Sequence, residues 1–172
     1  MSEGDEPIGS PEHLNPEHDL SGFSSGNQVL DDWLTRRARA NEESGASRTY
    51  VVCVAGKKVV GYYALATGAI ALHRATGRTR RNMPDPIPVM VLGRLAVHTG
   101  YQARGVGRGL LRDAILRTLQ AADIAGIRAI LVHAISEEAR RLYQSCGFSV
   151  SPLDPMTLMI TVGEAARNVS KG

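Results

Sequence analysis

A glycine-rich turn in the middle of the chain has the composition of an anion-binding site. Gly105, Gly107 and Gly109 follow an apolar run, Val89–Val97, and precede an amphipathic segment. A glycine has no Cβ, so a ligand can approach its backbone and unusual backbone angles cost little. If the amphipathic segment is a helix, its first N–H groups are free to bind an anion. The stretch therefore predicts a phosphate site.

Two common phosphate motifs are excluded by residues that this turn lacks. A dinucleotide fingerprint requires a glycine where Leu110 stands, and the next apolar run ends in His133 without a ribose-binding acid. A P-loop requires a lysine followed by serine or threonine, and the turn contains no lysine. What remains is the pattern Q-x-x-G-x-G, from Gln102 to Gly107.

The elements around the turn form a predicted strand–helix–strand unit. The run at 89–97 is apolar almost throughout, as expected for a strand with both faces covered. Residues 106–119 place their apolar side chains on one helical stripe, and 128–133 is a second buried-type strand. A crossover of this length implies a parallel pair of strands with a right-handed connection.

Two hairpins are predicted on either side of this unit. Residues 49–54 and 59–66 are rich in β-branched and aromatic residues and are separated by a tight turn. Residues 148–150 and 157–162 form the second hairpin, after a helix that Ser136 caps. The fold class is therefore α/β (α+β), with a mixed sheet, a central parallel strand pair and flanking helices.

At 172 residues the chain is most simply one domain. Residues 1–19 are rich in proline and acidic side chains and are expected to be a flexible acidic N-terminal segment. Asn27 is a predicted cap for a helix that carries Leu30, Trp33 and Leu34. The domain is expected to span 20–163, and 164–172 to form a frayed tail.

The charge of the chain is unevenly distributed. Six of its 17 acidic residues lie in residues 1–19, which contain no lysine or arginine. The remaining 11 acids face 20 lysines and arginines, so residues 20–172 carry a net charge of +9. This excess suits a polyanionic partner, although a basic surface also arises without one.

The arginines concentrate in two places. One group lies on the polar face of the predicted first helix, and the other lies in a loop, 73–88, that also holds three prolines. Either group could be a solvated face or a contact to RNA phosphates. The candidate RNA-binding residues are Arg36, Arg37, Arg39, Arg74, Arg78, Arg80 and Arg81.

The sequence has the features of a cytoplasmic protein. It contains no apolar run of the ~20 residues that a membrane span requires, and no signal-peptide pattern. Cys53 and Cys146 lie far apart without metal-ligand spacing, which is typical of buried thiols in a reducing compartment. No metal site is expected.

The Q-x-x-G-x-G turn resembles the acetyl-coenzyme A pyrophosphate loop of the GNAT N-acetyltransferase superfamily. The second signature of that family, A-x-x-x-Y-x-x-x-G-F, is matched by Ala139, Tyr143, Gly147 and Phe148. The resemblance covers roughly residues 20–162. It implies the GNAT fold, with a twisted and mostly antiparallel sheet, and acetyl-CoA as the co-substrate.

Within the superfamily, several stretches resemble the TacT-like toxins of type II toxin–antitoxin systems. Two of them are Leu92–Val97 (LGRLAV) and Ser151–Leu158 (SPLDPMTL). That branch acetylates the amino group of aminoacyl-tRNA and so inhibits translation. The resemblance therefore implies an aminoacyl-tRNA substrate, a ribbon-helix-helix antitoxin as partner, and a homodimer.

The resemblance also assigns roles to residues of the site. Tyr143 would donate a proton to the departing thiolate; the alternative is that its ring belongs only to the apolar stripe of its helix. The backbone of Leu95–Val97 would pair with the pantetheine arm. The coenzyme-binding residues implied are Leu95, Ala96, Val97, Gln102, Ala103, Arg104, Gly105, Val106, Gly107 and Arg108.

Other acceptors and other roles remain open from the sequence. The acceptor could instead be a small amine or a protein amine, although acids suited to a polyamine cleft are few after residue 19. A non-catalytic acyl-CoA-binding module is a third reading. A general base is not required, because an α-amino group with a pKa of ~7.7–8 is partly neutral at pH 7. His133 could relay a proton or be structural.

Overall fold

The computed structural model describes residues 4–171. Glu3, which belongs to the expected acidic segment, and Gly172, the last residue of the expected tail, lie outside the described residues. The described chain divides into two compact units. The first unit comprises residues 1–66 and 94–113, and the second comprises residues 67–93 and 114–172.

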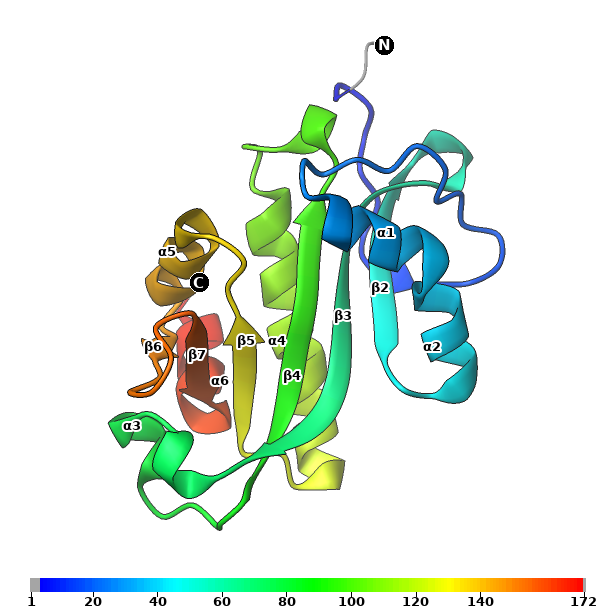
Figure 1. Ribbon diagram of the computed structural model, residues 1–172. Coiled ribbons are helices and arrows are strands. Elements are labelled where there is room, and N and C mark those ends of the chain that lie inside the picture. The colour runs from blue at the N-terminus through cyan, green and yellow to red at the C-terminus, as the bar shows by residue number, and fades with distance from the viewer. Residues whose placement is uncertain (1–3, 172) are drawn as a thin grey trace. The chain divides into compact units, whose positions relative to one another are not determined.

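The described chain contains both strands and helices, interspersed along the sequence (Figure 1). The strands are β1 (Glu12–His13), β2 (Arg48–Val54), β3 (Lys58–Ile70), β4 (Ile87–Val97), β5 (Ala129–His133), β6 (Ser149–Val150) and β7 (Thr157–Thr161). The helices are α1 (Gln28–Arg36), α2 (Ala38–Ser44), α3 (Gly77–Arg80), α4 (Val106–Ala125), α5 (Glu137–Ser145) and α6 (Val162–Ser170). None of the described helices is long and apolar enough to cross a membrane.

The strands form a mixed seven-stranded sheet in the order β1-β2-β3-β4-β5-β7-β6. The β2–β3 and β6–β7 pairs are antiparallel, which confirms both predicted hairpins. The β4–β5 pair is parallel, with Val89 opposite Ala129 and Leu92 opposite Val132. The predicted fold class, with its central parallel pair, is therefore confirmed.

The core of the first unit forms where α1 buries its apolar stripe. Leu30, Trp33 and Leu34 pack with Tyr62 of β3 and Ala96 of β4 in one cluster. Asn27 caps α1 as predicted, because its side chain accepts a hydrogen bond from the Leu30 N–H (3.2 Å). The helix ends at Arg36 and α2 starts at Ala38, so the predicted single helix is two short helices.

The second unit is built around β5 and β7. Ala129 and Leu131 of β5 pack with Met159 of β7 and with Ile87 and Val89 of β4. Both α5 and α6 contact β7, and Figure 1 draws α6 close to it. Ser136 caps α5 as predicted, since its Oγ accepts a hydrogen bond from the Ala139 N–H (3.1 Å).

The acidic N-terminal segment is more ordered than its composition indicated. Strand β1 pairs with β2, and the Gly9 N–H donates to the Cys53 carbonyl (2.9 Å). Leu14 and His18 are buried. Because the backbone of any sequence can pair with a strand edge, a polar composition does not by itself leave a segment flexible.

The end of the chain also differs from the frayed tail expected. Residues 162–170 form helix α6, whose first turn is capped by Thr161; the Glu164 N–H donates to the Thr161 hydroxyl (3.0 Å). Ala165 is buried, so this helix has a packed face. Gly163, which in the sequence indicated the end of regular structure, lies inside the first turn of α6, where a glycine is tolerated.

Candidate active site

The predicted coenzyme loop lies in the first unit, between β4 and α4. Ala103 and Gly105 have φ angles of +61° and +84°, which are left-handed values. This conformation turns the chain sharply into α4, whose Gly109 N–H donates to the Gly105 carbonyl (3.0 Å). The loop therefore leads directly into the first turn of α4, and the first turn of a helix is where backbone N–H groups bind anions.

Gln102 fixes the position of this loop. Its side-chain Nε2 donates to the carbonyls of Val97 (2.8 Å) and Ser25 (2.7 Å). The first bond closes the turn after β4, and the second ties the turn to the segment that precedes α1. Gln102 is thus a structural member of the motif.

Ser25, whose carbonyl accepts the bond from Gln102, is also held by Asp31 of α1. Asp31 is a buried acid whose carboxylate accepts bonds from the Ser25 N–H (3.0 Å) and from the Ser25 hydroxyl (2.6 Å). Ser24 adds two bonds, because its carbonyl accepts from Thr99 N–H (2.9 Å) and its N–H donates to His98 Nδ1 (3.0 Å). Helix α1 and the coenzyme loop are therefore linked by one hydrogen-bonded network.

Sequence reasoning missed this network. From the sequence alone, Asp31 is an acid in the first turn of a predicted helix, where an acid stabilises the helix dipole. No local pattern links Asp31 to Ser25 or Ser25 to Gln102, which are 77 residues apart. Only the tertiary fold brings these residues together.

Strand β4 offers backbone beyond its parallel pairing. Its pairing with β5 ends at Leu92, whereas β4 continues to Val97. Leu95–Val97, the predicted pantetheine contact, belongs to this extension. Leu95 Cδ2 lies 4.0 Å from the position of a Cβ at Gly107, so the strand extension and the coenzyme loop are neighbours.

An acid from the N-terminal segment approaches the loop. The Arg104 guanidinium lies 4.0 Å from the Asp5 carboxylate, and both side chains are about half exposed. The backbone of Gly4 also lies close to Gly100 and Arg104, so close that a Cβ at Gly4 would meet the Gly100 carbonyl oxygen. The described N-terminus therefore packs on the coenzyme loop.

Tyr143 lies in the second unit, in the last turns of α5. Its side chain is buried, and its ring centroid is 5.7 Å from that of Phe148, the last residue of the second predicted signature. Burial raises the pKa of Tyr143 to about 12, so the phenol stays protonated well above neutral pH. Among residues 4–171, none hydrogen-bonds to its hydroxyl.

Comparison with known proteins identifies the family. The acetyltransferase (GNAT) domain matches residues 46–150. A tRNA-acetylating toxin of Mycobacterium tuberculosis is 52% identical over 156 residues, which cover 91% of this chain and 93% of that protein. The chain belongs to the GNAT acetyltransferase family.

Solved structures of GNAT toxins share the fold. AtaT complexed with acetyl-methionyl-tRNAfMet superposes with a TM-score of 0.85 at 24% identity, covering 94% of this chain and 98% of that chain. A tyrosine-to-phenylalanine mutant of AtaT bound to the C-terminus of the antitoxin AtaR and acetyl-CoA gives a TM-score of 0.79 at 24% identity, covering 93% and 96%. These structures confirm the expected fold, and the domain match together with the 52% identical relative confirms the resemblance to the GNAT superfamily.

The arginines of the first helical face differ in what they contact in this GNAT acetyltransferase. Arg36 and Arg37 are exposed at the end of α1, and neither has a carboxylate partner within 4.0 Å among the described residues. Arg39 donates from Nη2 to the His18 carbonyl (2.6 Å) and so holds the N-terminal segment. Its guanidinium is therefore already bonded within the chain.

The second arginine group contains one residue that braces its own loop. Arg80 donates from Nε to the Ala75 carbonyl (3.1 Å) and from Nη2 to the His73 carbonyl (2.8 Å). Arg74, Arg78 and Arg81 are exposed, and Arg78 lies 3.9 Å from Glu164 of α6. The predicted loop also contains one helical turn, α3, capped by Thr76.

His133 takes part in a structural chain of hydrogen bonds. Its Nδ1 lies 2.9 Å from the Thr157 hydroxyl, which in turn donates to the Asp154 carboxylate (2.8 Å). Bonds from the Met156 N–H and from Thr157 lower the pKa of Asp154. The ring therefore fixes the β6–β7 turn, which favours the structural interpretation of His133.

One group of described residues has the donor types of a metal site. The ligand atoms of Glu12, His18 and Cys53 lie within 4.8 Å of one another. However, the Asn15 N–H donates to His18 Nδ1 (2.9 Å), so the ring proton is on Nε2, which bonds to Glu12 (2.5 Å). A protonated Nε2 cannot ligate a metal, and these contacts describe an imidazole–carboxylate pair.

Proposed function

We propose that this chain is an acetyl-CoA-dependent toxin that acetylates the α-amino group of aminoacyl-tRNA and so inhibits translation. The observation that carries the proposal is the 52% identity to a tRNA-acetylating toxin along 91% of the chain. Similarity of this extent includes both the coenzyme loop and Tyr143. We also propose that the protein acts in the cytoplasm, where translation occurs.

The residues of the coenzyme loop fit the pyrophosphate of acetyl-CoA. The loop is exposed, and a Cβ at Gly105 or Gly109 would have no atom within 4 Å, so the backbone can be approached. The N–H groups of Gly105, Val106 and Gly107 would bind the phosphate oxygens at the start of α4. Arg104 and Arg108 would add positive charge, with Arg104 released from Asp5.

The reaction supplied by acetyl-CoA is transfer of an acetyl group from a thioester to an amine. The amine nitrogen forms a bond to the carbonyl carbon, the carbon–sulfur bond breaks, and the amine loses a proton. Tyr143 would donate its phenolic proton to the departing thiolate, because its raised pKa keeps that proton in place. The backbone N–H groups of Leu95–Val97 would orient the thioester carbonyl.

The partners follow from the same relatives. One structural neighbour is a toxin bound to the C-terminus of its antitoxin. We propose a corresponding antitoxin of the ribbon-helix-helix class for this chain, and a homodimer as the assembled toxin. Co-expression with a neighbouring small reading frame of that class, followed by co-purification and rescue of growth, tests the first point.

Transfer of labelled acetyl groups distinguishes this function from the alternatives. The protein is incubated with labelled acetyl-CoA and one of four acceptors: charged tRNA, the same tRNA after deacylation, a polyamine, or a peptide with free amino groups. We expect label on charged tRNA alone. Label on the polyamine or the peptide would favour the alternative acceptor, and coenzyme binding without any transfer would favour a non-catalytic module.

A further inference from the structure

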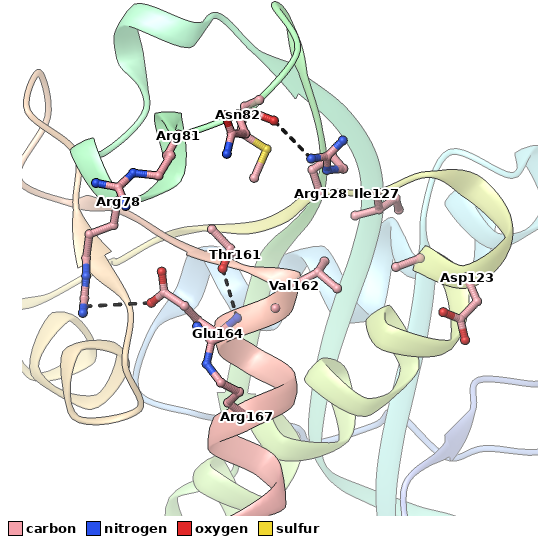
Figure 2. Close-up of a pocket in the computed structure, with 13 residues that line it drawn as sticks. Arg78, Arg81, Asn82, Asp123, Ile127, Arg128, Thr161, Val162, Glu164 and Arg167 are labelled. Carbon is pink, nitrogen blue, oxygen red and sulfur yellow. Dashed lines mark hydrogen bonds and ion pairs between the residues drawn. The ribbon is translucent and has the colours of Figure 1, made fainter.

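The second unit contains a cleft that the acetyl-transfer chemistry does not use. It has a volume of about 520 Å³ and lies where the end of α3, the end of α4 and the start of α6 come together (Figure 2). Its lining residues come from sequence segments near 80, 125 and 163, so only the tertiary fold creates it.

Positive charge dominates the lining of this cleft. Four arginines contribute to it, Arg78, Arg81, Arg128 and Arg167, against two acids, Asp123 and Glu164. The net charge of the lining is therefore +2. The cleft also receives the positive end of helix α6, whose first residues are part of its wall.

The four arginines of the cleft differ in whether another residue of the chain contacts their guanidinium groups. Arg78 lies 3.9 Å from the Glu164 carboxylate, and Arg128 donates to the Asn82 carbonyl (3.3 Å). Arg81 and Arg167 are exposed, and neither has a carboxylate within 4.0 Å among residues 4–171. These two guanidinium groups are available to a ligand, and a guanidinium binds phosphate oxygens in a bidentate manner.

The cleft and the catalytic helix lie at opposite ends of one strand. Arg128 immediately precedes β5, whereas the segment that leads to α5 and Tyr143 leaves the other end of β5 after His133. Five residues of strand separate these ends by about 13 Å. A ligand that contacts both ends must therefore span at least this distance, which a single phosphate ion does not.

We propose that this cleft binds the phosphodiester backbone of the acceptor RNA, with Arg81 and Arg167 as the contacts to phosphate. The proposal rests on the proposed function, because it takes aminoacyl-tRNA as the acceptor. A docked protein would need an apolar anchor, and the exposed large apolar residues Val29, Leu116, Ile124, Ile135 and Leu153 do not line the cleft. RNA needs no such anchor, because its affinity comes mainly from its phosphates.

The test compares two double variants of the full-length protein that remove equal charge. Arg81→Gln with Arg167→Gln removes the two available cleft arginines. Arg112→Gln with Lys171→Gln removes two exposed cations outside the cleft, and Lys171 follows the same helix as Arg167. Affinity for fluorescent total tRNA and KM for charged tRNA are measured from about 50 to about 200 mM salt, the range over which phosphate contacts dominate.

We expect the cleft variant to bind tRNA more weakly and with less dependence on salt. Each lost phosphate contact lowers the slope of log affinity against log salt by about 0.7–0.9, so two contacts make the loss over this range about tenfold smaller than in the wild type. KM for acetyl-CoA and kcat at saturating tRNA are expected to stay unchanged. The control variant is expected to match the wild type.

The same measurements distinguish failure of the proposed RNA-binding cleft from failure of the proposed acetyl-transfer function. A cleft variant with wild-type tRNA affinity and salt slope would show that the cleft does not hold RNA, even if the enzyme acetylates charged tRNA. If that variant instead lost binding to polyglutamate while retaining RNA, the cleft would be a site for an acidic protein. A wild type that binds tRNA through the cleft without acetylating it would contradict the proposed function alone.

Discussion

At the scale of a single residue, burial suits Tyr143 to the role of general acid that is proposed for it. A phenol has an unperturbed pKa near ~10, and burial disfavours its charged form. In this chain burial raises the pKa of Tyr143 to about 12. The buried ring therefore carries its proton throughout the physiological range, and the phenol is present in the protonated form that the proposed transfer to the departing thiolate requires.

Substituting Tyr143 by phenylalanine tests that role. The ring packing against Phe148 stays, and only the hydroxyl is lost, so acetyl-CoA affinity is expected to remain within about twofold. The rate of acetyl transfer is expected to fall by about 10²–10⁴, the usual contribution of a general acid. Calorimetric titration with acetyl-CoA and steady-state rates separate the two quantities. A variant with full activity would leave Tyr143 as a packing residue.

The pH dependence of the rate follows from two groups whose pKa values lie far apart. The attacking α-amino group has to lose its proton, with a pKa of ~7.7–8. Tyr143 has to keep its proton, and its raised pKa ensures this up to strongly alkaline pH. Initial kcat/KM is therefore expected to rise through about pH 8 and then level off. After correction for deacylation of the substrate, a decrease in kcat/KM with rising pH that begins before about pH 9 would contradict the assignment of Tyr143 as the acid.

At the scale of elements, helix α1 and the coenzyme loop form one hydrogen-bonded unit. Gln102 bonds to the Ser25 carbonyl, and Asp31 holds Ser25 from the other side. The conformation of the loop thus depends on a helix that lies far away in the sequence. We infer that Asp31 acts as a positioning residue for coenzyme binding.

Removing the Asp31 carboxylate is expected to loosen the loop. In Asp31→Ala the Ser25 N–H loses its acceptor, and an unpaired donor of this kind costs about 1–3 kcal/mol of unfolding free energy. KM for acetyl-CoA is expected to rise while kcat is largely retained. Urea unfolding and initial rates measure both effects. Asp32→Ala, at the neighbouring residue of the same helix, provides the control, since the Asp32 carboxylate accepts a hydrogen bond from Gln28 of α1 itself. Equal effects of the two changes would refute the role of Asp31.

Local patterns predicted the elements that have local causes. The caps Asn27 and Ser136 satisfy N–H groups three residues away, and the 49–66 hairpin closes through a short turn. The prediction failed where a distant partner decides the structure. The edge of β2 orders residues 12–13, and contact with β7 gives α6 a face to bury.

The candidate site was predicted to the same extent. Motif spacing selected the loop and Tyr143, because each motif lies within one short segment. It could not select Asp31, nor the cleft arginines Arg128 and Arg167, whose neighbours come from other parts of the chain. Nor could it separate Arg80, which bonds to its own loop, from the exposed Arg81.

At the scale of the whole molecule, charge and sheet topology are consistent with a polyanionic acceptor. Residues 20–172 carry a net charge of +9, and the six acids of the N-terminal segment reduce the charge of the whole chain to +3. In the mixed sheet, strands β4 and β5 form a parallel pair. The coenzyme loop follows β4 in the sequence, and α5 follows β5. The GNAT framework thus supplies the acetyl-transfer chemistry, and the arginines outside it are proposed to select RNA.

The position of the acetyl group on the product is the most direct measurement of this account. Charged tRNA is incubated with the protein and acetyl-CoA, digested to nucleosides, and the terminal aminoacyl-adenosine is analysed by mass spectrometry; a Tyr143→Phe reaction run in parallel is the control. We expect N-acetyl-aminoacyl-adenosine from the wild type and almost none from the variant. Unmodified aminoacyl-adenosine from an enzyme that consumes acetyl-CoA, or an acetyl group elsewhere on the RNA, would contradict it.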